Sequence, residues 1–349
     1  MLKDRRMLIC VIVSFLVVLI WYAFQSGPAP LQTANGVNSL EQVELNGVKQ
    51  WISIRGTDIH NPVLLFLHGG PGSANLAKLR LQVPELEQNF IIVNWDQPGA
   101  GKSAPLNFDY GTLSNERIFS DAHELVETLK ARFGVEKIYL MGFSWGTVIG
   151  LELAAQYPED FYAYISVSQV VSPVEAERFS LEYVQAMARD SDNEQAKTEL
   201  TGIDPSYQGN DWYSQISTER KWLVRFNGVY HTAESYSHEV WIMLRAPEYS
   251  LYEFGLWSPA SSHSLKQLWP EVMGLNFFES ITVLDIPVFF FVGRYDQNCP
   301  AQLTERYFEQ LLDPAGKHLI WFEDSAHDLF FDQPQLVIAE ILSIRGIQP

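Results

Sequence analysis

One pentapeptide in this chain has the residue types of a catalytic turn. Gly142-Phe143-Ser144-Trp145-Gly146 follows the mainly apolar run 137–141, and a segment with helical character, 147–155, comes next. This order predicts a strand, a sharp turn and a helix, with Ser144 held out on the turn. The glycines remove side chains that would collide with neighbouring backbone, and the positive N-terminal end of the helix faces the serine. Ser144 is therefore the candidate nucleophile, although this pattern alone also arises by chance.

A glycine-rich loop upstream has the composition of an oxyanion-binding turn. The apolar run 62–67 predicts a buried strand, which ends in His68-Gly69-Gly70-Pro71-Gly72. An acyl-transfer serine enzyme needs two N–H donors directed at the developing oxyanion, one from the residue after the nucleophile and one from such a loop. The sequence predicts that Trp145 and Gly70 supply them. The alternative interpretation is a Gly/Pro turn without chemistry.

An acid and a base follow two further predicted strands. The strand 287–292 leads into Gly293-Arg294-Tyr295-Asp296, and the strand 318–322 leads to Asp324-Ser325-Ala326-His327. Open α/β sheets place functional groups beyond the carboxyl ends of their strands. We therefore expect His327 to be the general base and Asp296 to orient it, with Asp324 as a competing acid. The chain order Ser144, Asp296, His327 is that of the α/β-hydrolase fold.

The motifs together carry a family resemblance. The segments 68–72, Asn94-Trp95-Asp96-Gln97-Pro98-Gly99-Ala100-Gly101-Lys102-Ser103 and 142–146 resemble the signature set of the proline iminopeptidase family of α/β hydrolases. The similarity extends over residues 40–345. The resemblance implies an enzyme that removes an N-terminal residue, often proline, from short peptides. Pro98 stands where members of this family usually carry arginine, which weakens the transfer of their substrate preference.

Length and composition agree with one α/β domain that carries a large insertion. The chain has 349 residues, of which 47% are hydrophobic, and its predicted strands and helices alternate with short turns between them. The formal charge of −18 argues against nucleic acid as a partner, because a phosphate backbone would be repelled. The acidic surface favours solubility, with attraction for cationic or amino-terminal substrates as a functional alternative.

The N-terminus has the pattern of a membrane anchor. Lys3, Arg5 and Arg6 precede an uncharged stretch from Met7 to Phe24, which is about the length needed to cross a bilayer. We expect a transmembrane signal anchor that leaves the catalytic domain on the extracytoplasmic side, since basic residues before a span stay in the cytoplasm. Secretion after cleavage of a signal peptide is the alternative. Residues 25–39 are rich in Gly, Pro, Asn and Ser and predict a tether.

Cysteine usage is compatible with this picture. Cys10 lies in the predicted span and Cys299 lies near the acid loop, so no disulfide is expected within the outer domain. Cys299 has no second thiol or Cys-x-x-Cys spacing beside it, and we interpret it as a structural loop cysteine. No metal-ligand cluster is evident, and neither a metal nor another cofactor is predicted.

More than a hundred residues separate the strand 161–167 from the strand that begins at Pro287. We interpret this insertion as a helical cap. Its candidate helices are Glu175–Arg189, Asn193–Leu200 and Thr218–Phe226, broken by Pro205, Gly209 and Gly228. The predicted organisation is residues 1–25 as cytoplasmic tip and anchor, 26–39 as linker, 40–171 and 281–349 as the α/β-hydrolase core, and 172–280 as the cap.

The cap should supply the groups that bind substrate. Five tryptophans lie in it, and we expect most of them to form its core and one or two to form an apolar slot near the serine: Trp212, Trp222, Trp241, Trp257 and Trp269. An aminopeptidase must also pair the free ammonium of its substrate with carboxylates. The available acids are Glu175, Glu177, Glu182, Glu219, Glu234 and Glu239, each of which has a solvent-facing helix position as its alternative.

The sequence thus predicts a membrane-anchored serine hydrolase that releases N-terminal residues from short peptides through an acyl-enzyme. One alternative is an esterase or amidase for small apolar substrates, which uses the same triad without an amine-binding site. A second alternative is a non-catalytic binding or sensor protein on the same fold.

Overall fold

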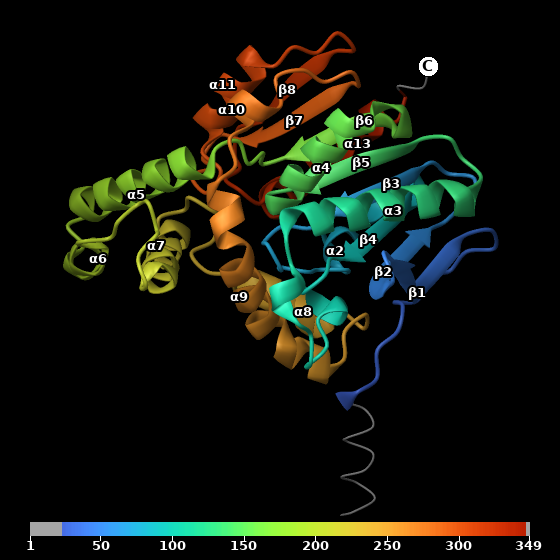
Figure 1. Cartoon of the computed structure of the whole chain (residues 1–349), viewed down its shortest axis with the longest axis horizontal. Helices are drawn as coiled ribbons and strands as arrows, with labels where there is room; N and C mark the ends of the chain where they lie inside the picture. The colour runs from blue at the N-terminus through green and yellow to red at the C-terminus, as the bar shows by residue number, and fades with distance from the viewer. Residues whose placement is uncertain (1–22, 347–349) are drawn as a thin grey trace, which may run out of the picture.

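The computed structural model of the chain describes residues 23–346. An eight-stranded sheet forms its centre, in the order β1-β2-β4-β3-β5-β6-β7-β8 (Figure 1). The strands β3 to β8 run parallel to one another, whereas β1 and β2 pair antiparallel with each other and β2 pairs antiparallel with β4. The bounds are β1 Val37–Leu45, β2 Val48–Gly56, β3 Val63–Leu67, β4 Ile91–Asp96, β5 Ile138–Phe143, β6 Phe161–Val167, β7 Val288–Gly293 and β8 Lys317–Phe322.

Helices cover both faces of the sheet. One face carries α3 (Asn115–Phe133), α4 (Trp145–Gln156) and α11 (Ala301–Gln310), and the other carries α2 (Lys78–Gln82), α12 (Leu329–Asp332) and α13 (Pro334–Ile344). Along β3, Leu65 and Leu67 face the first layer, while Leu64 and Phe66 face the second. Because side chains of a strand alternate between faces, a strand buried on both sides must be apolar throughout, as β3, β5 and β7 are.

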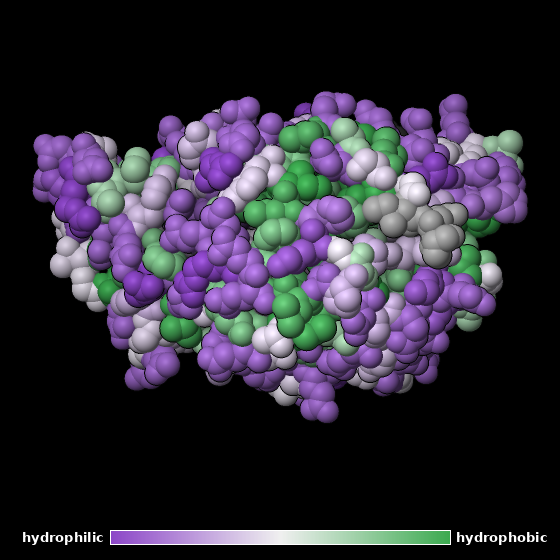
Figure 2. Space-filling view, turned by 90° about the horizontal axis from the view of Figure 1, so that it is seen from above, coloured by the Kyte–Doolittle hydropathy of each residue, from purple (hydrophilic) through white to green (hydrophobic). Residues whose placement is uncertain are grey.

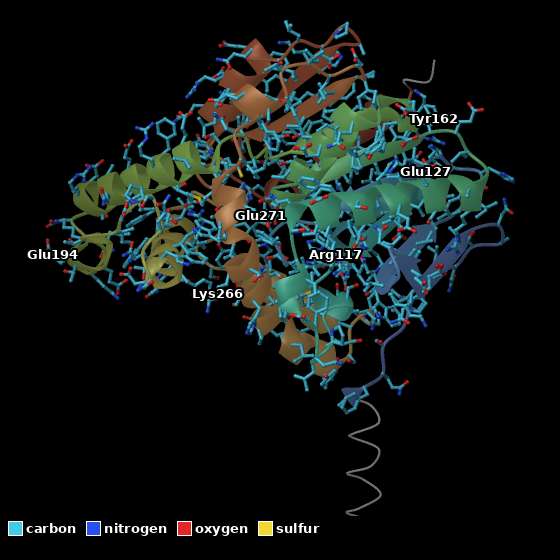
Figure 3. All side chains as sticks on the ribbon, in the orientation of Figure 1. Arg117, Glu127, Tyr162, Glu194, Lys266 and Glu271 are labelled. Atoms are coloured by element: carbon cyan, nitrogen blue, oxygen red, sulfur yellow. The ribbon has the colours of Figure 1, made fainter. Side chains whose placement is uncertain are left out.

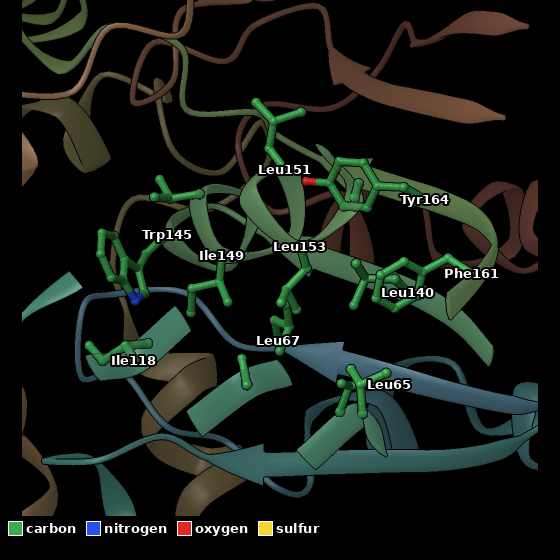
Figure 4. Close-up of a cluster of buried hydrophobic side chains, with 14 of the residues drawn as sticks. Leu65, Leu67, Ile118, Leu140, Trp145, Ile149, Leu151, Leu153, Phe161 and Tyr164 are labelled. Atoms are coloured by element: carbon green, nitrogen blue, oxygen red, sulfur yellow. The ribbon is translucent and has the colours of Figure 1, made fainter. Parts of the chain in front are cut away.

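The first of these layers holds the helix that follows the catalytic motif. Ile149 and Leu153 of α4 pack on Leu65, Leu67 and Leu140 of the sheet (Figure 4). The whole sequence of α4 is apolar except for Thr147, Glu152 and Gln156, so the helix is buried on most sides. This packing fixes the position of the turn at its N-terminus.

Six helices lie between β6 and β7, and we call the first five of them the cap helices. They are α5 (Pro173–Asp190), α6 (Glu194–Leu200), α7 (Trp212–Arg225), α8 (Ser237–Arg245) and α9 (Leu251–Met273), and the short α10 (Phe277–Ser280) follows them. Helices α5, α6 and α7 share a small core of their own, and Glu194 marks the outer end of α6, away from the sheet (Figure 3). Helix α9 lies against the core, where the Glu271 carboxylate accepts a hydrogen bond of 2.6 Å from the backbone N–H of Asn115.

The predicted strands and helices of the core agree with the observed ones, with smaller differences elsewhere. Strand β1 begins at Val37, inside the stretch 26–39 that the sequence predicts as linker. Helix α7 begins at Trp212, six residues before the predicted start. Helix α9 continues through Pro259 and Pro270, against the usual effect of proline in a helix interior.

The membrane prediction concerns a different part of the chain. Within residues 23–346, no helix is both long enough and apolar enough to span a bilayer. The expected tip and span, residues 1–25, lie outside the described residues except for their last three, so the structure gives no support to a transmembrane helix there. Hydrophilic side chains cover much of the face seen in Figure 2. The chain has 42 acidic and 24 basic residues, which agrees with such a polar surface.

Candidate active site

Ser144 occupies a strained turn between β5 and α4. Its backbone has φ 53° and ψ −121°, a conformation that a residue other than glycine adopts only where the surrounding structure enforces it. The turn is tight, because a Cβ at Gly146 would lie 2.0 Å from the carbonyl oxygen of Leu67 in β3. The predicted strand, turn and helix are therefore present, and glycine at position 146 is required by the close approach of two backbones.

The structure brings the predicted base and acid together. His327 Nδ1 lies 2.9 Å from Asp296 Oδ2, and Asp296 Oδ1 accepts hydrogen bonds from the backbone N–H groups of Asn298 (2.9 Å) and Cys299 (2.8 Å). Asp296 is 1% exposed. The competing acid Asp324, by contrast, has an exposed side chain. The loops after β7 and β8 thus hold Asp296 against His327, as expected for the carboxyl ends of parallel strands.

The Asp296 contact determines the protonation state of the imidazole. A carboxylate only accepts hydrogen bonds, so in the neutral ring Nδ1 carries the proton and Nε2 keeps the lone pair with which it can act as a base. Burial lowers the pKa of His327, but the Asp296 carboxylate, with a smaller effect of Cys299, raises this pKa above the ordinary histidine value. The pair therefore stabilises an imidazolium, which is the state that forms when the base removes a proton.

Two residues beside the base were not predicted as part of the site. The Asn298 side-chain nitrogen lies 3.2 Å from His327 Nε2, and the buried Cys299 thiol interacts with the same ring. In the described part of the chain, Ser144 makes no hydrogen bond with His327, although both line one cavity. Such contacts often tighten only when substrate is bound. Burial raises the pKa of the Cys299 thiol, so it stays protonated at neutral pH.

The second sequence motif joins the glycine loop to the serine turn. The Gln97 side chain donates to the His68 carbonyl (3.1 Å) and accepts from the Trp145 indole N–H (3.0 Å). The Gln97 backbone N–H donates to His68 Nε2 (3.2 Å), which leaves Nδ1 of the neutral ring to donate to the Gly69 carbonyl (2.7 Å). Burial lowers the pKa of His68 to about 4, so this ring stays neutral. The motif is evident in the sequence, but this bridging role depends on contacts between distant residues.

The predicted oxyanion donors lie at this junction. Gly70 and Trp145 line the same cavity as Ser144. Gly70 has φ +130°, a conformation that side-chain-bearing residues rarely adopt, and a Cβ there would lie 2.4 Å from the backbone nitrogen of Gly72. Glycine is therefore needed for the loop to approach the serine turn.

A cavity of about 580 Å³ opens between Ser144 and the cap helices. This volume is within the usual range for a small-molecule site. Of the five cap tryptophans, Trp257 and Trp269 line the cavity, whereas Trp222 is buried in the cap core and Trp241 is exposed. Trp212 stacks on Trp269 at a ring distance of 4.8 Å. Aromatic side chains from α9 therefore form part of the wall opposite the catalytic turn.

Two of the six candidate acids form a buried cluster with Arg220. Arg220 pairs with Glu177 (2.5 Å) and with Glu219, and Glu177 and Arg220 line the cavity. Among the described residues, Glu177 Oε2 and Glu219 Oε1 are buried without a hydrogen-bond partner. Burial, together with the nearby Glu177 carboxylate, raises the pKa of Glu219 to about 7 against the opposing effect of Arg220. With both acids ionised, the cluster carries one negative charge in excess.

The other candidate acids have partners or face solvent. Glu175 pairs with Arg306 and Glu182 with Arg178 at the surface, and Glu234 is exposed. Glu239 accepts from Lys78 (2.6 Å) and from the Asn75 amide (3.0 Å).

Lys78 lies at the centre of a second cluster of acidic side chains beside the cavity. Its Nζ lies 2.6 Å from both Glu239 and Asp328, close to His238. These side chains have the spacing of metal ligands, but an ammonium group already neutralises the carboxylates. This group therefore acts as an ion-pair link between α2, α8 and the loop that carries His327.

Comparison with known proteins agrees with this geometry. A model of the alpha/beta hydrolase fold family matches residues 62–334. The chain therefore belongs to the α/β-hydrolase family, and its sheet order and the loops that carry Ser144, Asp296 and His327 are those of that fold.

Two relatives and one solved structure show which members of this family the chain resembles. The chain is 30% identical over 308 residues to the "Probable aminopeptidase YbaC" of Bacillus subtilis (strain 168), covering 85% of this chain and 93% of that protein. It is 22% identical to a proline iminopeptidase of Heyndrickxia coagulans, over 80% of this chain and 88% of that protein. Among solved structures, the proline iminopeptidase of Mycobacterium smegmatis superimposes with a TM-score of 0.62 at 16% identity, covering 88% and 97% of the two chains. The resemblance to proline iminopeptidases drawn from the motifs is thus confirmed.

Proposed function

We propose that this protein is a serine aminopeptidase of the proline iminopeptidase type. The observation that carries the proposal is the buried Glu177–Glu219–Arg220 cluster, which contributes to the wall of the Ser144 cavity and carries excess negative charge. A carboxylate oxygen buried without a partner costs free energy, and a substrate ammonium would supply that partner. The aminopeptidase and proline iminopeptidase relatives support the same activity.

The proposed catalytic steps are those of a Ser–His–Asp triad. Ser144 Oγ attacks the carbonyl carbon of the N-terminal residue, and His327 Nε2 takes the hydroxyl proton. The N–H groups of Gly70 and Trp145 stabilise the oxyanion. The tetrahedral intermediate collapses, His327 returns the proton to the departing amine, and an acyl-enzyme remains. Water, activated by His327, then releases the N-terminal residue and restores Ser144. Asp296 holds the imidazole in the required tautomer throughout.

Glu177 and Glu219 are better candidates for ammonium binding than Glu239. Both oxygens of Glu239 already accept hydrogen bonds from Lys78 and Asn75, and the nearby Asp328 also pairs with Lys78. The cluster around Arg220, in contrast, has one unused oxygen on each acid. The apolar cavity wall, which includes Trp257 and Trp269, suits a compact ring such as that of proline.

The test compares free and blocked substrates on the same enzyme. Prolyl-naphthylamide and alanyl-naphthylamide should be cleaved, and their N-acetyl forms should be cleaved at least a hundred-fold more slowly, since acetylation removes the charge and leaves carboxylates unpaired. Equal rates would favour the esterase or amidase alternative. A fluorophosphonate probe that labels the parent but not Ser144→Ala would exclude the non-catalytic alternative.

The location of the enzyme is a separate part of the proposal. The uncharged stretch 7–24 behind three basic residues supports a signal anchor that places the catalytic domain outside the cytoplasmic membrane. Flotation of the full chain with lipid vesicles tests this point.

A further inference from the structure

Exposed apolar side chains gather on one part of the cap. Of fourteen exposed large hydrophobic residues between residues 23 and 346, six belong to the short segment 236–252: Tyr236, Val240, Trp241, Leu244, Leu251 and Tyr252. A seventh, Phe24, packs its ring on Tyr252 at 5.0 Å. We call these seven residues the cap patch. Single exposed apolar residues are ordinary on a protein surface, but a contiguous group of this kind marks a binding surface.

Helix α8 presents this patch as a regular face. Its exposed positions are 237, 240, 241, 244 and 245, which follow helical spacing, and they include Val240, Trp241 and Leu244. Trp241 is 57% exposed and the Arg245 guanidinium lies over its ring at 5.5 Å. An amphipathic helix of a soluble domain turns its apolar stripe inward. Here part of that stripe faces outward, with the aromatic and basic side chains typical of a helix at a lipid interface.

The charges around the patch are arranged to leave it free of carboxylates. The segment 236–256 contains three acidic residues, and each forms an ion pair: Glu239 with Lys78, Glu248 with Arg80, and Glu253 with Lys102. Their side chains are at most 21% exposed. In a chain with a net charge of −18, a surface segment without a free carboxylate is unusual. An apolar face without free carboxylates and with a basic side chain at its edge, here Arg245, suits insertion between lipid headgroups.

The N-terminal segment reaches the same surface. Besides the Phe24 contact, the Gly27 N–H donates to the Pro247 carbonyl (2.8 Å), and Lys102 donates to Ser26 (2.8 Å) beside Glu253. In Figure 1, the first described residues lie at the end of the molecule where α9 begins. Phe24, the last residue of the uncharged stretch 7–24, is therefore part of the patch.

We propose that the cap patch docks on the surface of a lipid bilayer, beside the point where the N-terminal segment would enter it. Val240 and Trp241 would lie at headgroup depth, where amphipathic aromatic side chains are favoured. Because Glu239 and Val240 also line the catalytic cavity, α8 would form the wall between that cavity and the membrane. This inference concerns an interaction surface and does not depend on which bond the enzyme cleaves.

The experiment places a reporter on the patch of the full chain. Leu244→Cys, in a Cys10→Ala background, carries a bimane label, and the protein is mixed with phosphatidylcholine vesicles whose acyl chains are brominated. The matched control is Leu312→Cys, 65% exposed in the loop after α11 at the opposite end of the molecule. The background protein without an added cysteine corrects for labelling of Cys299.

We expect the label at position 244 to lose most of its fluorescence in brominated vesicles and the label at 312 to lose none. Flotation without quenching at 244 would overturn the docking surface while leaving the anchor intact, and failure to float would overturn both. Energy transfer between differently labelled 244 positions would show that a second copy covers the patch instead. A 244 label that is equally shielded from water with and without vesicles would show that residues 7–22 cover it.

Discussion

Replacing Glu177 or Glu219 by glutamine tests the amine site most directly. Glutamine keeps the shape of the side chain, and Arg220 retains one carboxylate partner in either variant. The excess negative charge of the cluster, however, falls to zero. Loss of one partner from a buried, hydrogen-bonded charge pair costs about 2–5 kcal/mol, which corresponds to a roughly 30- to 4000-fold loss in kcat/KM.

Glu177→Gln should have the larger effect of the two. Glu177 lines the cavity itself, and Glu219, with a pKa raised to about 7, is only about half ionised at neutral pH before substrate binds. Part of the energy of an ammonium contact to Glu219 is therefore spent on removing its proton. Glu182→Gln on the same helix as Glu177 is the control, since Glu182 forms only an exposed pair with Arg178. Such a pair contributes at most a few tenths of a kcal/mol, and kcat/KM should stay near the parent value.

The assay measures kcat/KM for prolyl-naphthylamide and for a simple neutral ester in each variant. The ester has no ammonium, so its turnover should change little while that of the amine substrate falls. Similar losses on both substrates would indicate damage to the fold or triad, and no loss on the amine substrate would refute the amine site.

The same cluster predicts a pH dependence with a defined sign. Burial raises the pKa of Glu219 to about 7, so this acid is protonated below that pH and ionised above it. The ratio of kcat/KM for the amine substrate to that for the ester should therefore rise as pH increases through about 7. It should fall again above about 8, where the substrate α-amino group loses its proton. His327 contributes to both substrates and cancels in the ratio. In Glu219→Gln the rise should be absent.

Four further substitutions test the proposed catalytic turn and triad. Ser144→Ala should lower turnover at least about a thousand-fold while circular dichroism and Tm stay near the parent values, and activity within tenfold would remove Ser144 as nucleophile. Asp296→Asn should lower kcat by about four orders of magnitude because it favours the wrong imidazole tautomer. Asp324→Asn, at an exposed position, should change kcat little. A larger loss in Asp324→Asn than in Asp296→Asn would make Asp324 the acid of the triad. Gly146→Ala places a Cβ 2.0 Å from the Leu67 carbonyl oxygen, and overpacking of about 3 kcal/mol should lower the Tm by roughly 4 °C in a chain of this length; an unchanged Tm in a thermal melt would contradict this interpretation of the turn.

The candidate catalytic residues could be predicted from the sequence because each follows a strand within a few positions. Ser144 directly follows β5, Asp296 lies three residues after β7, and His327 lies five residues after β8. A parallel sheet brings such positions to one edge whatever the loops contain. Strand position does not exclude Asp324, which lies two residues after β8, but the 2.9 Å contact to His327 favours Asp296.

The proposed amine-binding residues could not be predicted in the same way. Glu177 lies in α5 and Glu219 in α7, and only the packing of these helices brings both to Arg220. No local pattern distinguishes them from the surface acid Glu182. The bridging role of Gln97 depends likewise on contacts between β3, β4 and α4 that are distant in sequence. Helix α9 was missed because Pro259 and Pro270 argue against a continuous helix, yet tertiary packing overrides that local preference.

The cap also contacts the proposed triad, because its α7–α8 loop is hydrogen-bonded to the loops that carry His327 and Asp296. The Val229 carbonyl accepts hydrogen bonds from the backbone N–H groups of His327 (2.9 Å) and Asp328 (3.2 Å), and the Gly228 carbonyl accepts one from Gln297 (3.0 Å), next to Asp296. A shift of α7 would therefore move the loops of both the base and the acid, together with the Glu219 carboxylate. Substrate recognition and proton transfer are thus coupled through one short loop. A substitution in the cap can change which N-terminal residue fits the cavity. It must leave these three hydrogen bonds to the Val229 and Gly228 carbonyls in place, because they connect the cap to the loops at the edge of the sheet.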